Sequence, residues 1–308
     1  MTNRWWSYQK ERFPIFAHGP LIVIFCLAVM YFSAVQQEQM ILPGFLRVSG
    51  AVISALILFF QLRVADEFKD FDIDSKYRPE RPVPRGLVSL DELARLAYAG
   101  AAIQLLIATI IDVGLVPILV GLWAYAGLMT KEFFAPEWLR RHPVVYLLSH
   151  MLVMPIVAFY VSAFDWLCVC REMPGGLIWL LLVSFFCGLV LELGRKIRLP
   201  GDERKGVETY SGLWGTGTSL AIWFASIAAA VTAYANAAAL ITSSYLHLSL
   251  AATALVVGIL TVSLFPKRFD RGFPDIAARV IEPSSGLVAI LLYLGLGPLQ
   301  AVLRLHGA

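Results

Sequence analysis

Runs of mostly apolar residues, each long enough to cross a bilayer as a helix, recur along almost the whole of the 308-residue chain. A transmembrane helix needs about 20 such residues. Nine candidates lie at approximately 16–36, 44–64, 91–112, 114–131, 143–163, 175–194, 212–234, 239–265 and 283–303. We therefore expect an all-α, polytopic membrane protein in which nine transmembrane helices form one bundle around a central cavity.

Composition agrees with a membrane protein. Hydrophobic residues make up 58% of the chain and charged residues only 15%, whereas a soluble domain carries nearer a quarter charged residues. The spans leave no room for a separate soluble domain, so residues 1–308 are expected to be a single domain. The net charge of +3 is small and its basic residues lie in loops, which argues for topology and against nucleic-acid binding.

The first 14 residues do not resemble a cleavable signal peptide, because no apolar core precedes their aromatic and charged residues. Trp5, Trp6 and Tyr8 instead favour an interfacial helix at headgroup depth. The N-terminal segment and the loops on its side carry 21 of the 25 Lys and Arg residues. By the positive-inside rule, the N-terminus and these loops face the cytoplasm of an inner (cytoplasmic) membrane, and nine spans place the C-terminus outside.

The most distinctive segment follows the second span and reads D-E-F-K-D-F-D-I-D-S-K-Y-R-P-E-R-P-V-P-R-G. In it Asp66, Asp70 and Asp74 recur every fourth residue, which on a helix aligns three carboxylates along one face. Carboxylate oxygens suit Mg²⁺, which typically takes one or two of them and completes its shell with water and substrate phosphates. These aspartates are therefore predicted magnesium ligands.

Basic residues and prolines follow the acidic stripe closely. The side chains of Arg78 and Arg81 can bind phosphate oxygens bidentately. Pro79, Pro82 and Pro84 forbid helix continuation and predict an extended segment. Carboxylates suited to a metal and arginines suited to phosphate thus lie together at a membrane surface. This combination indicates a diphosphate carried by a lipid. Residues 66–89 are therefore expected to form a cytoplasmic active-site loop. The alternative is a solvated loop of mixed charge.

This segment resembles the first signature of the UbiA superfamily of intramembrane prenyltransferases, in which the first acidic position is usually Asn and here is Asp66. The resemblance implies an intramembrane prenyltransferase that uses Mg²⁺ to ionise an isoprenyl diphosphate. The isoprenyl group would pass to an aromatic ring or another small lipophilic acceptor. Asp66, Asp70 and Asp74 would be catalytic metal ligands, and Arg78 and Arg81 would contact the diphosphate.

Three further candidates lie at the cytoplasmic ends of spans 4 and 5. Tyr125 and Lys131 resemble the family's pattern after its fourth span, which would make Tyr125 a substrate contact and Lys131 a catalytic residue. An interfacial aromatic beside a snorkelling lysine is the alternative. His150 lies about two turns below the cytoplasmic entry, where an ionisable group is costly unless it faces a cavity. Its candidate role is acceptor binding or proton uptake, and the alternative is a hydrogen-bonded structural histidine.

A second charged loop, residues 192–211, follows span 6. Asp202, Gly206 and Thr209 have the D-x-x-x-G-x-x-T order that closes the family's second acidic signature, but Arg198 stands where the family usually has another aspartate. Three interpretations remain open. Glu192, Asp202 and Glu203 could hold a second ion; Lys196 and Arg198 could replace part of that site and bind diphosphate; or the loop could be a structural salt-bridge cluster. The candidate substrate contacts here are Glu192, Lys196, Arg198 and Tyr210, and the candidate metal ligand is Asp202.

Two other functions are compatible with the same residues. The chain could be a transferase that acts on a polyprenyl phosphate carrier with a soluble diphosphate donor. It could also be a divalent-cation transporter, although no charged pathway crosses the middle of the spans, where transport sites usually lie. The cysteines are less informative: Cys26 and Cys187 lie in apolar spans, and the C-V-C of Cys168 and Cys170 indicates a disulfide or simple burial rather than a zinc site.

Overall fold

The computed structural model describes residues 3–37, 43–199, 201, 203, 206–242, 244–269 and 276–305, and these residues form helices joined by turns. The long helices are α2 (Ile15–Gln36), α3 (Phe45–Tyr77), α4 (Leu90–Ile111), α5 (Leu115–Thr130), α8 (Val153–Val169), α9 (Leu177–Arg195), α11 (Thr216–Ala239), α12 (Leu246–Phe269) and α13 (Ile276–Leu296). The short ones are α1 (Arg4–Arg12), η1 (Glu132–Phe134), α6 (Pro136–Arg141), α7 (Pro143–Met151), α10 (Tyr210–Trp214) and α14 (Pro298–Leu305). The all-α fold is confirmed.

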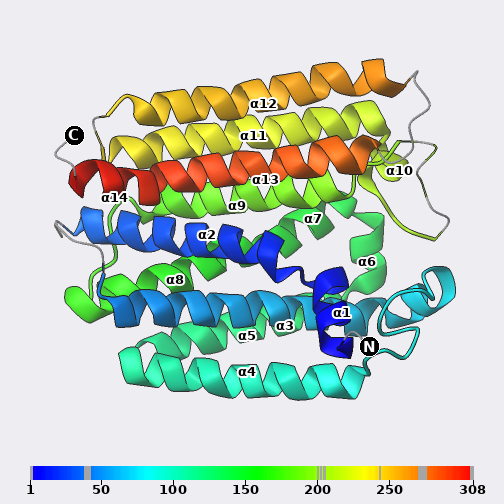
Figure 1. The fold of residues 1–308 in the computed structure, drawn as a ribbon, viewed down its shortest axis with the longest axis horizontal. Helices are drawn as coiled ribbons and strands as arrows, with labels where there is room; N and C mark the ends of the chain where they lie inside the picture. Colours follow the sequence, from blue (N-terminus) through cyan, green and yellow to red (C-terminus); the bar gives the residue numbers. More distant parts are fainter. Residues whose placement is uncertain are drawn as a thin grey trace.

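Within the described residues, eight helical segments are long and apolar enough to cross a membrane, and the expected fourth span is the shorter apolar helix α5. Each predicted span thus coincides with one helix or, at 143–163, with two consecutive helices, although α5 has only 16 residues. The helices lie side by side in one bundle, with α4 and α12 at its two edges and α2, α9 and α13 between them (Figure 1). The first and last helices, α1 and α14, lie at opposite ends of the bundle (Figure 1).

The end of the bundle that carries α1, α6, α10 and the turn at 78–89 is called the charged end below. Helix α3 extends 13 residues past the expected end of its span at residue 64 and stops at Tyr77. The acidic residues are therefore helical, as their spacing predicts. The proline-containing part that follows forms turns, in which the Arg81 N–H is donated to the Arg78 carbonyl and the Arg85 N–H to the Arg81 carbonyl, each over 3.0 Å, so the prediction of an extended segment was wrong. Arg78 closes the helix by donating its backbone N–H to the Asp74 carbonyl over 2.8 Å.

Helix α4 begins with the capping box that its sequence favours. The Ser89 hydroxyl accepts the N–H of Glu92, and the Glu92 carboxylate accepts the N–H of Ser89 over 3.0 Å. The predicted fifth span is instead two helices, since α7 ends at Met151 and α8 begins at Val153. Pro155 lacks the N–H that would pair with the Met151 carbonyl, which accounts for a break at this place.

Helix α1 packs across the charged end. Its Tyr8 is 2% exposed and joins a small apolar cluster with Val64, Val83, Val88 and Leu93, separate from the main core of the bundle. The N-cap Asn3 accepts the Trp5 N–H over 3.0 Å. Burial in this cluster, together with the nearby Glu67 carboxylate, raises the pKa of Tyr8 well above its usual value. Because Tyr8 packs in this cluster, the end of α1, with Arg12, lies over the acidic part of α3.

Candidate active site

Asp74, the last member of the acidic stripe, is buried among arginines. Only 2% of its surface is exposed. Arg78 and Arg81, both from the proline-containing turn, approach its two carboxylate oxygens at 3.4 and 2.5 Å, and Arg12 of α1 lies 4.0 Å away. Arginines from two separate segments therefore satisfy this carboxylate. The turn brings the predicted diphosphate contacts Arg78 and Arg81 next to the stripe.

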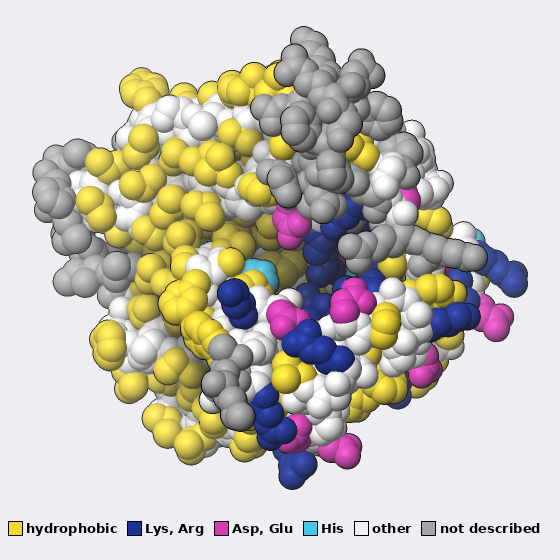
Figure 2. All heavy atoms as spheres, turned by 45° about the vertical axis from the view of Figure 1, so that its right-hand side comes forward, with side chains coloured by type: hydrophobic (Ala, Val, Ile, Leu, Met, Phe, Trp, Pro, Cys, Tyr) yellow, Lys and Arg dark blue, Asp and Glu magenta, His cyan; other side chains and the backbone are white. Residues whose placement is uncertain are grey.

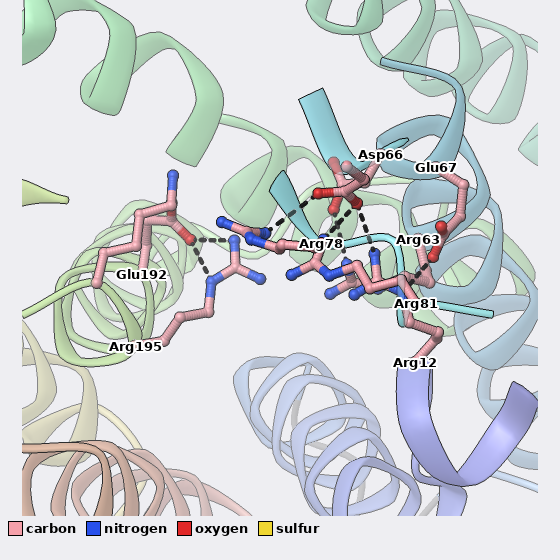
Figure 3. Close-up of polar contacts among 10 residues, drawn as sticks. Arg12, Arg63, Asp66, Glu67, Arg78, Arg81, Glu192 and Arg195 are labelled. Carbon is pink, nitrogen blue, oxygen red and sulfur yellow. Dashed lines mark hydrogen bonds and ion pairs between the residues drawn. The ribbon is translucent and has the colours of Figure 1, made fainter. Parts of the chain in front are cut away.

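Arg12 and Glu67 form a second buried pair beside Asp74. Glu67 lies on α3 one residue after Asp66, and its carboxylate accepts from the Arg12 Nε. The Nη2 atom of Arg12 is buried and has no hydrogen-bond partner in the described part of the chain. Figure 3 shows Arg12, Arg63, Arg81 and Glu67 gathered on one side of this cluster. Sequence reasoning missed both Arg12 and Glu67, because no motif links them.

Asp66 and Asp70 are the carboxylates of the stripe that remain closest to solvent. Asp66 is 43% exposed and lies 3.4 Å from Arg63, one turn earlier on α3. Asp70 has no ion pair or hydrogen bond with another described residue. Among the described residues, no three His, Cys, Asp or Glu side chains come together to hold a metal ion. The pair nevertheless fits Mg²⁺, which commonly uses one or two carboxylates and takes its other ligands from phosphate and water.

Lys69 connects α3 to the segments after α5. Its Nζ lies 2.7 Å from the Glu132 carboxylate and donates to the Tyr146 hydroxyl over 2.8 Å. Glu132, Phe133 and Phe134 all have positive φ angles of 48–58°, a left-handed conformation that costs non-glycine residues about 1–2 kcal/mol each. Such strain persists only where surrounding contacts determine it, and the Lys69–Glu132 pair is one such contact.

The predicted pair Tyr125 and Lys131 separates in the structure. The Tyr125 hydroxyl donates to the Ser149 carbonyl over 2.5 Å, and its ring packs edge-on against Phe133. Lys131 is exposed at the end of α5, and its side chain makes no hydrogen bond or ion pair with another described residue. The lysine that links this region to the acidic helix is Lys69, which lies on α3 itself, and its position beside the stripe could have drawn attention to it.

His150 stacks on Tyr146, with ring centroids 3.9 Å apart, and its Nδ1 lies 2.8 Å from the Tyr146 carbonyl. Because a carbonyl can only accept, Nδ1 carries the proton in this hydrogen bond. The other ring nitrogen, Nε2, is buried without a partner among the described residues. His150 therefore combines a structural hydrogen bond with a free acceptor atom, and it is joined to Lys69 through Tyr146.

The end of α9 and the segment after it contribute more cations. The Glu192 carboxylate accepts from Arg195 over 2.6 and 2.9 Å and from Lys196 over 2.9 Å. Burial alone would lower the pKa of Lys196, but Glu192 more than offsets this effect, so that the pKa of Lys196 is raised. Figure 3 shows Arg78 lying between the Glu192–Arg195 pair and the residues of α3. The two charged segments therefore meet, although more than a hundred residues separate them in sequence.

Other predicted residues of this segment have structural contacts. The Arg198 guanidinium donates to the Ile197 carbonyl over 3.1 Å. Tyr210 is 4% exposed, its ring centroid lies 5.6 Å from the Lys196 Nζ, and burial, helped by Glu192, raises its pKa. Gly206, at φ +79°, lies so close to Tyr77 that a Cβ would come within 2.6 Å of the ring. A glycine is thus required where this segment meets the end of α3. Asp202 lies outside the described residues.

The charged end is hollowed (Figure 2), and Lys and Arg side chains gather along one side of the hollow while hydrophobic side chains line the other. This arrangement suits a ligand with an anionic head and an apolar tail. The opposite end carries no comparable cluster in the described part of the chain. There Arg171 pairs with Asp112 over 2.9 Å, and Cys168 and Cys170 are free thiols, as are Cys26 and Cys187.

Comparison with known proteins places this chain in a family. A sequence model described as the UbiA prenyltransferase family matches residues 13–281. The digeranylgeranylglyceryl phosphate synthase of Methanopyrus kandleri is 27% identical over 250 residues, which cover 79% of this chain and 86% of the relative.

Solved structures show the same fold. A UbiA homologue from Aeropyrum pernix K1 superposes with a TM-score of 0.66 at 19% identity, covering 89% of this chain and 96% of its own. A digeranylgeranylglyceryl phosphate synthase gives 0.60 at 16% identity, covering 95% and 98%. A UbiA homologue from Archaeoglobus fulgidus bound to DMAPP and Mg²⁺ gives 0.57 at 14% identity, covering 94% and 98%.

Proposed function

The chain belongs to the UbiA prenyltransferase family, and we propose that it transfers an isoprenyl group from an isoprenyl diphosphate to a small lipophilic acceptor within the membrane. The observation that carries this proposal is the meeting of two charged segments at the hollowed end of a helical membrane bundle (Figures 2 and 3). Family membership favours an isoprenyl donor over a soluble diphosphate donor and over divalent-cation transport.

Asp66 and Asp70 are the residues that would hold Mg²⁺, because they are neighbours on one face of α3 and are less buried than Asp74. Asp74 is the third predicted ligand, but three arginines surround it, so its carboxylate would have to exchange partners to bind a metal. Magnesium bound to this stripe supplies charge neutralisation for the departing diphosphate. The relative from Archaeoglobus fulgidus, whose structure contains DMAPP and Mg²⁺, supports this choice of cation.

The two arginines of the proline-containing turn are candidate diphosphate contacts. Arg78 and Arg81 each use part of the guanidinium to bind Asp74 and keep 17% and 24% of their side-chain surfaces exposed. Guanidinium has five N–H donors in a fixed fork, so donors remain for diphosphate oxygens. Asp74 fixes the direction of both forks. Donors held in place before the reaction stabilise charge that develops on the leaving group without reorganising.

We propose two candidate classes of acceptor. An aromatic ring is the expectation from the family resemblance. A prenylated glyceryl phosphate is the second, and it is favoured by the similarity over most of both chains to a digeranylgeranylglyceryl phosphate synthase. The free Nε2 of His150 offers an acceptor for the hydroxyl proton of either a phenol or a glycerol. The charged end would face the cytoplasm of the inner membrane, where soluble diphosphates are available.

The test is turnover by the purified protein in detergent or lipid nanodiscs. Radiolabelled dimethylallyl, farnesyl and geranylgeranyl diphosphates are each supplied with Mg²⁺ and with either 4-hydroxybenzoate or geranylgeranylglyceryl phosphate. We expect diphosphate release coupled to a prenylated product, and loss of both in excess EDTA. No transfer with any donor, together with Mn²⁺ flux into proteoliposomes, would overturn the proposal in favour of a transporter.

A further inference from the structure

The end of α9 and the segment after it present cations where the stripe on α3 presents carboxylates. The described carboxylates between residues 192 and 211 are Glu192, Glu203 and Glu208, of which Glu208 is exposed. Glu192 is 8% exposed, and both of its oxygens are engaged: one accepts from Arg195 and the other from Lys196. Neither oxygen is left to face a metal ion without losing a cation that already lies within 3 Å of it.

The Glu203 carboxylate stabilises the conformation of the loop through hydrogen bonds. It accepts from the Thr209 hydroxyl over 2.6 and 2.7 Å and from the Ser211 hydroxyl over 2.7 Å. The Ser211 oxygen in turn accepts the backbone N–H of Arg198 over 2.8 Å. These bonds close the loop onto the start of α10. The candidate ligand Asp202 lies outside the described residues.

The charges on this side oppose a second divalent cation. Arg195 and Lys196 form ion pairs with Glu192. Figure 3 shows Arg195 directed toward the arginines beside α3. A divalent ion placed among them would meet two positive charges and only one carboxylate, and like charges at short range repel strongly in a partly buried site. The described residues therefore fit one metal at Asp66 and Asp70 and do not fit a second beside Glu192.

We propose that Arg195 and Lys196, held in place by Glu192, take the position of a second metal ion, so that this protein binds its diphosphate with a single divalent cation. The proposal rests on the proposed function, because it concerns the same diphosphate. It also assigns the Glu192 carboxylate a role as the residue that positions the two cations and not as a metal ligand.

Metal stoichiometry tests the proposal without relying on turnover. Mn²⁺ is titrated into the purified protein with farnesyl S-thiolodiphosphate, an unreactive donor analogue, and free Mn²⁺ is counted by electron paramagnetic resonance. We expect one bound ion per chain at saturation, and still one in Asp202→Asn. Two ions per chain would overturn the proposal while leaving the proposed function intact. Failure to bind both the analogue and Mn²⁺ would overturn the proposed function and this inference together.

The cationic role is tested by calorimetric binding of the same analogue. Arg195→Gln and Lys196→Gln should each weaken the affinity by about one to two orders of magnitude, the usual value of a charge-assisted hydrogen bond, with the stoichiometry still at one. Matched controls are Arg171→Gln at the opposite end of the bundle and Lys10→Gln on the exposed side of α1, which should leave the affinity unchanged.

Lys196→Gln is expected to fold, because Arg195 still forms an ion pair with the buried Glu192 carboxylate in that variant. Thermal unfolding of each variant establishes that it is folded before binding is measured. Unchanged analogue affinity in folded Arg195→Gln and Lys196→Gln would overturn the proposal. So would a second bound Mn²⁺ in the unmodified protein that is lost in Glu192→Gln.

Discussion

Arg12 of the N-terminal helix and Glu67 of α3 form an ion pair in which only 9% and 1% of the two side chains are exposed. The pair joins the first helix of the chain to the helix that carries the acidic stripe. Arg12 also lies 4.0 Å from Asp74, so a single residue of α1 contacts two buried carboxylates. The N-terminal helix is therefore part of the charged end.

Breaking this pair should destabilise the protein. Arg12→Ala leaves Glu67 as an uncompensated buried charge, and loss of one partner of a buried pair typically costs about 3–5 kcal/mol. Thermal unfolding in detergent should show a marked fall in the melting temperature, with recovery in Arg12→Ala/Glu67→Gln. Arg4→Ala is the control, because Arg4 is 51% exposed in its pair with Glu92 and exposed pairs contribute about 0–1 kcal/mol. Equal losses in Arg4→Ala and Arg12→Ala would contradict the burial argument.

Substitutions of Asp70 and Asp74 should differ in their effects on stability. Asp70→Asn removes a predicted metal ligand without breaking an ion pair among the described residues, so we expect turnover to be abolished with little change in unfolding temperature. Asp74→Asn weakens the contacts with Arg78 and Arg81 and should lower both turnover and stability. Rates are measured across a Mg²⁺ titration and stability by thermal unfolding. Wild-type rates in both variants would show that the metal assignment is wrong.

His150 should act on the acceptor and not on the donor. His150→Phe keeps the ring stacked on Tyr146 but removes Nε2, and loss of one hydrogen bond should lower acceptor kcat/KM by about tenfold. Affinity for the thiolodiphosphate analogue should not change. His142→Phe is a close control, since His142 also stacks on an aromatic ring four residues earlier and approaches its carbonyl over 2.7 Å, but is exposed. A loss of turnover in both variants would point to a general effect on folding.

The left-handed turn after α5 should tolerate glycine. Phe134 is 78% exposed and has φ 58°, so Phe134→Gly relieves about 1–2 kcal/mol of strain against a backbone-entropy cost of about 0.5–1 kcal/mol. We expect an unchanged or higher melting temperature. Phe68→Gly, at a half-exposed position within α3, should instead lower stability by about 1 kcal/mol. Equal destabilisation by the two substitutions would argue against a left-handed turn.

Orientation in the membrane can be tested by cysteine labelling. Ser75 is exposed near the end of α3, and Cys170 is exposed at the opposite end of the bundle. In intact cells an impermeant maleimide should label Cys170 but not Ser75→Cys in a Cys170→Ser background, while inside-out vesicles should give the reverse. Labelling of Ser75→Cys in intact cells would overturn the cytoplasmic placement of the charged end.

Local rules were enough to locate most helices of this protein. The spans follow from the number of apolar residues that a bilayer requires, and the helical spacing of Asp66, Asp70 and Asp74 is realised because α3 continues to Tyr77. The N-cap at Ser89 also follows from its neighbours. The break between α7 and α8 was not predicted, although Pro155 is a visible cause, because a proline near a helix start can be tolerated.

The sequence by itself determined the membrane bundle, the family and the two charged segments, since each depends on residues that are close together along the chain. Only the tertiary structure decided which carboxylates already have cationic partners. Arg12 reaches Glu67 and Asp74 from another helix, and Lys69 reaches Glu132 and Tyr146 across the charged end. Ion pairing depends on distance in space and on burial, and a sequence pattern specifies neither for residues that lie far apart in the chain.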